Sequence, residues 1–136
     1  MTETTSLDLD GIARGALSIG DVQSAAIFVV GPASSALRLA AAAGIEGPPL
    51  DGLVAAVQNP AHPVARALGA DGPTFDVLPT APGGPRLRSH LPLRVDLDGD
   101  RATVGVLAVA HDSPLDEAAR GELVDLADAA AAIAAR

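Results

Sequence analysis

The sequence has no cysteine, no lysine, no tyrosine and no tryptophan. Without cysteine the chain cannot form disulfides, use a thiolate nucleophile, bind zinc through sulfur or attach a chromophore through a thioether. Its net charge is −8, and all of its basic side chains other than histidine are arginines. An acidic chain with no basic run and no stacking aromatic residues repels a phosphate backbone, so we expect no nucleic-acid partner.

Long apolar runs are also missing, since no stretch approaches the roughly 18 residues of a membrane span. The first ten residues, MTETTSLDLD, are acidic and polar. They have neither the basic nor the apolar part of a signal peptide. We therefore expect a cytoplasmic protein with no membrane partner.

Aromatic residues make up 1% of the chain, and the two phenylalanines are Phe28 and Phe75. The hydrophobic fraction of 49% is still enough to form a core in one domain of 136 residues. Because alanine buries little area, such a core must depend on close approach of backbones.

The pattern of apolar residues predicts alternating helices and strands. A weak helix is expected over Leu7–Ile19, after a disordered tail at residues 1–6. Strands are expected at Ala25–Val30, Ala36–Ala43, Thr74–Leu78, Leu87–Leu97 and Thr103–Ala110. The alanine run in the second of these would also suit a helix. Short helices are expected at Leu50–Val57 and Val64–Leu68.

The last element is predicted to be an amphipathic helix with Ser113 as its N-cap and Pro114 in its first turn. Pro92 predicts an edge, a bulge or a bend in its strand. Phe75 and Val77 are expected on the same side of the strand Thr74–Leu78.

The elements together predict one α+β domain over residues 7–136. It has a central antiparallel sheet of five to six strands, helices packed on it, and adjacent N- and C-terminal helices.

This order of elements narrows the fold to PAS-like and GAF-like sensor domains, and the second half of the chain resembles a GAF domain. The matching positions are Arg88-Ser89, Pro92-Leu93, Asp98-Gly99, Gly105-Val106-Leu107 and Leu115-Asp116-Glu117. The resemblance extends over about residues 7 to 135. It departs from the family pattern between Asn59 and Arg86, the region that builds the ligand pocket in relatives.

The resemblance implies a non-catalytic regulatory domain that senses a small ligand between the sheet and residues 50–78. Candidate ligand-contacting residues are Phe28, Val57, Phe75, Val77, Arg88 and His90. Arg88 could hold a carboxylate or phosphate, or could be a surface arginine paired with an acid. The two phenylalanines could equally be core residues. GAF-like methionine sulfoxide reductases and bilin-binding relatives need cysteines, which this chain lacks, and no cyclic-nucleotide signature is present.

The three histidines have no metal-ligand spacing, so no metal site and no cofactor are expected. His62 is expected at a helix entry or in a loop, and His111 at the start of a turn. His90 is expected on the strand face opposite Leu91, facing solvent, with a ligand contact as the alternative. The DLDGD segment lacks the length and terminal Glu of a calcium loop and is interpreted as a hairpin turn.

A second hypothesis is a homodimerisation or protein-interaction module with a closed pocket, acting on an effector domain or a protein partner. The alanine-rich stripe of the last helix would let two copies approach closely. Its candidate contact residues are Leu115, Leu123, Leu126 and Ala130. The two hypotheses can both hold.

Overall fold

The computed structural model describes residues 2–30, 36–77, 87–97 and 99–134. The elements in chain order are α1 (Thr2–Ala16), β1 (Val22–Val30), β2 (Leu37–Ala43), α2 (Gly47–Ala56), α3 (Pro63–Ala67), β3 (Thr74–Val77), β4 (Leu87–Leu97), β5 (Asp100–His111) and α4 (Glu117–Ala134). The expected turn at 31–35, the loop at 79–86 and Asp98 of the expected hairpin turn lie outside the described residues.

The five strands form one sheet in the order β2-β1-β5-β4-β3, and every neighbouring pair is antiparallel. This confirms the predicted α+β class and its central antiparallel sheet. The alanine-rich segment after residue 36 is strand β2, because its partner β1 and the hydrophobic face it presents override the helix propensity of alanine.

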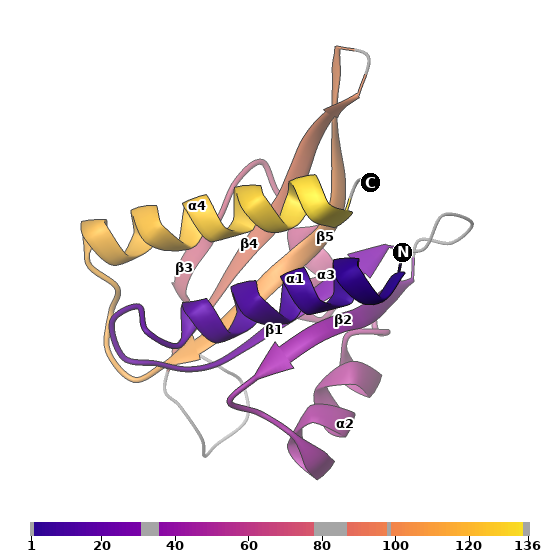
Figure 1. Ribbon diagram of the computed structural model, residues 1–136. Coiled ribbons are helices and arrows are strands. Elements are labelled where there is room, and N and C mark those ends of the chain that lie inside the picture. Colours follow the sequence, from indigo (N-terminus) through magenta and orange to yellow (C-terminus); the bar gives the residue numbers. More distant parts are fainter. Residues whose placement is uncertain (1, 31–35, 78–86, 98, 135–136) are drawn as a thin grey trace.

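Helices cover both faces of the sheet (Figure 1). α1 and α4 lie side by side on one face, over the larger core, which we call cluster 1. α3 packs against β4 and β5 on the opposite face, and α2 contributes to the same smaller core, cluster 2. The fully buried members of cluster 2 are Ala26, Phe28, Leu37, Val57, Val64, Ala67 and Val106.

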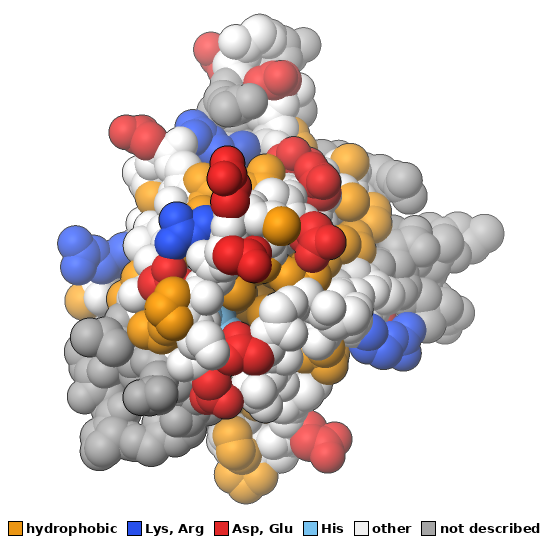
Figure 2. Space-filling model, turned by 90° about the vertical axis from the view of Figure 1, so that its left-hand side faces the viewer, with side chains coloured by type: hydrophobic (Ala, Val, Ile, Leu, Met, Phe, Trp, Pro, Cys, Tyr) orange, Lys and Arg blue, Asp and Glu red, His pale blue; other side chains and the backbone are white. Residues whose placement is uncertain are grey.

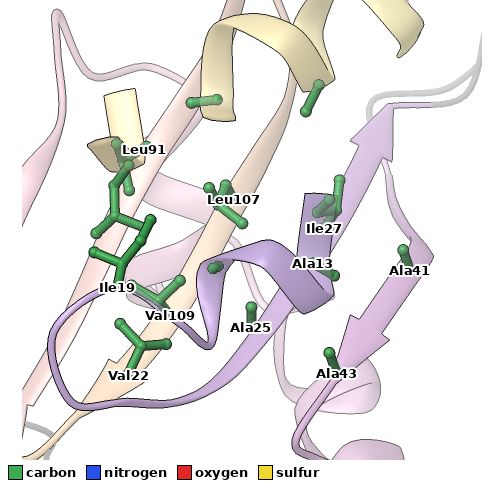
Figure 3. Packing of buried hydrophobic residues seen from close by; sticks show 14 of the residues in the cluster. Ala13, Ile19, Val22, Ala25, Ile27, Ala41, Ala43, Leu91, Leu107 and Val109 are labelled. Atoms are coloured by element: carbon green, nitrogen blue, oxygen red, sulfur yellow. The ribbon is translucent and has the colours of Figure 1, made fainter. Parts of the chain in front are cut away.

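Alanine side chains let α1 approach the sheet closely. Figure 3 shows Ala13 of α1 facing the small side chains of β1 and β2, among them Ala25 and Ala41. All three are less than 5% exposed. Because the core has so few aromatic residues, close packing is reached by bringing the backbones near one another rather than by inserting large rings, as the composition predicts.

The ends of the terminal helices differ from the sequence-based prediction. α1 begins at Thr2 and so includes residues 2–6, the segment expected to be a tail. α4 begins at Glu117, where the Asp116 carboxylate accepts a hydrogen bond from Ala119 N at 2.8 Å. The predicted N-cap Ser113 is wrong, because its hydroxyl instead donates to Asp21 Oδ2 at 2.7 Å.

The strand prediction for Leu87–Leu97 is confirmed as β4. β3 pairs with β4 only as far as Thr74 opposite His90, so Pro92 lies where β4 has one neighbouring strand, β5. A register shift follows between Leu93 and Arg94, with the extra residue on β5. The predicted irregularity near Pro92 is therefore present, and β4 itself keeps its alternation.

α1 begins and α4 ends at the same end of their helical layer (Figure 1). Among the helices of the described residues, none is long and apolar enough to cross a membrane.

Candidate functional site

Alternation along β4 assigns its side chains to the two cores. Leu91, Leu93 and Val95 all contact cluster 1 under α1 and α4. The residues between them, His90 and Arg94, therefore point to the opposite face, where α3 packs. The cross-strand partner of His90 is Ala108, which contacts cluster 2.

His90 is 5% exposed, so the expectation that it faces solvent is wrong. The alternation was assigned correctly, but the face it selects is covered by α3. Burial, followed by the nearby His62 and Arg88, lowers the pKa of His90 to about 4. The imidazole is therefore neutral at pH 7, with one nitrogen that can donate and one that can accept.

His62 is the N-cap of α3. Its Nδ1 accepts a hydrogen bond from Val64 N at 3.1 Å, which confirms the prediction of a helix-entry residue. This bond fixes the neutral tautomer with its proton on Nε2. Burial lowers the pKa of His62 below its usual value of 6.5.

Five of the six candidate ligand residues share the α3 face of the sheet. Phe28 and Val57 belong to cluster 2. Val77 and Arg88 are cross-strand partners and therefore lie on one face, which alternation makes the face of His90. Burial lowers the pKa of Arg88, which stays far above neutrality, so its charge remains.

Phe75 does not join them. It packs against cluster 1 on the other face, with the Arg120 guanidinium 4.9 Å from its ring centre. The prediction that Phe75 and Val77 share a side is wrong, because Asp76 between them has φ 59° and the β3–β4 register shifts there. A left-handed residue breaks the alternation of a strand.

A buried pair of polar side chains, which the sequence analysis did not predict, lies on the cluster 1 side of the sheet. Ser89 Oγ lies 2.8 Å from His111 Nε2, and His111 Nδ1 lies 2.8 Å from Ser113 O. A carbonyl can only accept, so Nδ1 carries a proton, and in the neutral ring Nε2 accepts from the serine. Ser89 Oγ also accepts from Asp76 N at 3.2 Å.

His111 is the last residue of β5 and is 0% exposed, which corrects its assignment to a turn. A serine beside a histidine is the geometry of an activated nucleophile. Here both side chains are fully buried, and the second imidazole nitrogen meets a backbone carbonyl instead of a carboxylate. The pair therefore connects β4 to the β5–α4 connection rather than facing a substrate.

Asp76 extends this network to α4. Its carboxylate accepts hydrogen bonds from Leu115 N at 3.0 Å and from Arg120 Nη2 at 2.6 Å. Burial raises the pKa of Asp76, but the Leu115 hydrogen bond and the Arg120 hydrogen bond and charge outweigh it, so the pKa lies below 3.8. Strand β3 is thus tied directly to the first turns of α4.

The residues expected at a dimer contact are placed in the chain's own core. Leu115, Leu123 and Ala130 are 5% exposed or less, in contact with cluster 1, and Leu126 is partly buried against it. Leu115, Leu123 and Ala130 are therefore covered by this chain's own core and are not available to a second copy. The prediction failed because an amphipathic stripe shows that a face is covered and does not show by what.

Metal-ligating side chains do not converge within the described residues: no group of three His, Asp or Glu could hold an ion. The acidic side chains are instead spread over the surface, as Figure 2 shows for the end of the molecule where α4 begins.

The sequence matches no family model and no curated protein. The structure, in contrast, is similar to several solved ones. The second GAF domain of DevS from Mycobacterium smegmatis has a TM-score of 0.70 at 22% identity, with 96% of this chain and 93% of that chain covered. The GAF domain of a phosphoenolpyruvate-protein phosphotransferase from Coxiella burnetii has a TM-score of 0.73 at 14% identity, with 96% and 82% covered.

A type II free methionine-R-sulfoxide reductase from Thermoplasma acidophilum is also similar, with a TM-score of 0.71 at 14% identity and coverage of 98% and 94%. At these identities the likeness concerns the fold and transfers no activity to this chain.

Proposed function

Because the chain folds as a GAF domain, we propose that it is a non-catalytic sensory or regulatory domain that binds a small molecule on the α3 face of its sheet. The observation that carries this proposal is His90, a buried imidazole whose cross-strand partner Ala108 packs against cluster 2. Buried polar side chains in a protein core normally have partners, and one without any beside an apolar cluster is typical of a binding site.

The hydrogen-bond network supplies a route from that face to the rest of the molecule. Strand β3 has Thr74 opposite His90, and two residues later Asp76 accepts hydrogen bonds from Leu115 N, just before α4, and from the Arg120 side chain in α4. A ligand that displaced β3 would therefore change the contacts of the first turns of α4. We propose that α4 reports occupancy to an effector domain or protein partner in the cytoplasm.

Absence of thiols supports the non-catalytic part of the proposal. With no cysteine, the chain cannot form the sulfenic acid or disulfide on which thiol-based sulfoxide reduction depends. The buried Ser89–His111 pair offers no alternative nucleophile, since neither side chain is accessible. We expect no activity of this chain on free methionine sulfoxide.

A thermal-shift screen of the full chain against a library of small metabolites tests ligand binding. A bound ligand raises the melting temperature, because it stabilises the folded state by mass action. Hydrogen exchange of residues 115–120 should then slow in the presence of the hit. No stabilisation by any compound would contradict the proposal.

Ala108→Leu provides a site-specific check, since it adds volume beside His90 on the α3 face. It should abolish the shift caused by the hit. The matched control is Ala129→Leu, at an exposed position of α4. A hit that stabilises both variants equally would bind elsewhere.

The second candidate function is a homodimerisation or interaction module. It is supported by the outer face of α4, which is exposed next to α1 and presents small residues, among them Ala118, Gly121 and Ala129. The same face carries Glu122 and Asp125, so two copies would bring like charges together. Light scattering should then show a dimer that strengthens with salt, and a monomer at every salt concentration would rule it out.

A further inference from the structure

Basic groups gather on the α3 face of β4. Arg88, His90 and Arg94 alternate with the cluster 1 residues of the same strand, and His62 of α3 is close enough to lower the pKa of His90. From Gly72 to Val95 the sequence has a single acidic residue, Asp76, and that carboxylate is paired with Arg120. In a chain of net charge −8, this strand face carries the two guanidinium charges of Arg88 and Arg94, while the imidazole of His90 is neutral at pH 7.

One of these side chains has a buried nitrogen without a partner among the described residues. Arg94 Nε is buried and has no hydrogen-bond partner, although Nη1 of the same guanidinium donates to Asp71 O. His90, on the same face of the strand, is 5% exposed. A buried donor left unpaired destabilises the fold by about 1–3 kcal/mol. Such groups are retained where something else pairs with them.

We infer that the α3 face of β4 binds a small organic anion, whose carboxylate or phosphate group pairs with the Nε edge of Arg94 and whose second polar group hydrogen-bonds to His90. This rests on the proposed ligand-binding function and names the class of ligand. The free edge of the guanidinium presents parallel N–H groups, which match a carboxylate or a phosphate in two hydrogen bonds.

The spacing of the two residues sets the size of the ligand. His90 and Arg94 are four residues apart on one strand, and four residues of a strand rise about 13 Å. Between them lie Pro92 and its partner Val106, both buried and apolar. An acid with a flat or compact apolar body fits this arrangement better than an inorganic ion.

The test uses 4-hydroxybenzoate and phenyl phosphate as anionic probes, with 4-hydroxybenzamide as the uncharged match and inorganic phosphate as the small ion. At millimolar concentration at least one organic anion should raise the melting temperature of the full chain by several degrees. The amide and inorganic phosphate should raise it less. A response to one anion and not to the other distinguishes a carboxylate from a phosphate ligand.

Arg94→Met should abolish the shift while leaving the melting temperature without probe unchanged or higher, because it removes an unpaired buried donor and keeps the length of the side chain. Arg94→Lys keeps the charge but lacks the parallel N–H groups of the guanidinium. Calorimetry should show binding at least tenfold weaker in this variant. The control Arg66→Gln removes an exposed guanidinium of α3 and should bind as the unaltered chain does.

Three results would overturn the inference. These are equal shifts with the amide, equal shifts in Arg94→Met, and no shift with any anion. If Arg94→Met instead lowers the melting temperature and no anion binds, the guanidinium is structural. A library hit that is uncharged and insensitive to Arg94 would leave the proposed sensory function standing and the anion inference refuted.

Discussion

At the scale of single residues, the buried imidazole of His90 makes the stability of the fold depend on pH. Its pKa of about 4 in the folded chain lies below the ordinary 6.5, so the unfolded chain binds the proton more readily between these values. A group of this kind stabilises the fold above pH 6.5, and its contribution is lost as the pH falls toward 4. The physical cause is the desolvation of an imidazolium under α3.

We predict that the free energy of unfolding falls by up to about 3 kcal/mol between pH 6.5 and 4 through His90 alone. His90→Gln cannot take up a proton and should remove most of that slope. Urea denaturation of both proteins across this range measures it. His62→Gln, which removes a histidine with a smaller perturbation, should flatten the slope less, and equal slopes in the unaltered chain and His90→Gln would contradict the assignment.

Asp76 combines a left-handed backbone with an ion pair, and the two can be separated by substitution. Asparagine tolerates φ 59° and keeps an acceptor for Leu115 N, so Asp76→Asn loses only the charge. Because Arg120 is 44% exposed, water screens the pair, and we expect a loss of about 1 kcal/mol at pH 7.

Asp76→Ala also loses the acceptor and the short polar side chain that lets aspartate and asparagine tolerate the left-handed region, so its loss should be about 2–3 kcal/mol. Chemical denaturation at pH 7 compares the two variants. Equal destabilisation would mean that neither the backbone conformation nor the Leu115 hydrogen bond matters.

At the scale of elements, the same substitution at two glycines should change the stability of the fold in opposite directions. A Cβ on Gly105 of β5 would collide with Phe28 O of β1, so the strands would have to separate. Gly105→Ala should destabilise the fold by about 3 kcal/mol. Gly121→Ala on α4 meets nothing within 4 Å and should stabilise it by about 0.5–1 kcal/mol.

Thermal melting of both glycine variants checks this pair. A neutral Gly105→Ala would show that β1 and β5 can move apart without loss. A destabilising Gly121→Ala would show that the outer surface of α4 is covered by something in solution.

The elements themselves could be predicted where their signals are local. The alternation of Leu91, Leu93 and Val95 gives β4 its bounds without knowledge of any neighbour. The Ser113 cap could not be predicted, because its hydroxyl turns to Asp21, 92 residues earlier in the chain. Likewise the side taken by Phe75 depends on a single left-handed residue that no periodicity reveals.

The candidate ligand residues remain a prediction, and the structure shows only how they are placed. Phe28, Val57, Val77, Arg88 and His90 do share one face, because strand alternation and the fold resemblance both point to it. The burial of His90 could not be predicted, since it needs α3 to cross over β4. The Ser89–His111 chain was missed because its members come from separate strands.

At the scale of the whole molecule, the two sides of the sheet differ in depth of packing. Cluster 1 is the larger, and α4 buries residues along its length, whereas α2 has no fully buried residue. Local opening takes less free energy where fewer apolar contacts must break. The α2 side is therefore the part that we expect to open most readily while the rest stays folded.

We predict that the amides of α2 exchange with solvent faster than those in the middle of α4 by at least about tenfold. Hydrogen exchange followed by mass spectrometry measures this in the unaltered chain. Equal protection of the two helices would mean that the whole domain opens as one unit.

The placement of α1 and α4 has a practical consequence. Since the first helix starts and the last helix finishes at one end of their shared layer, fluorescent reporters fused to the two termini would be neighbours in space. Energy transfer between them would then be high in the folded state and would drop when either helix detaches. Energy transfer between the two termini would therefore report whether α1 and α4 stay packed together.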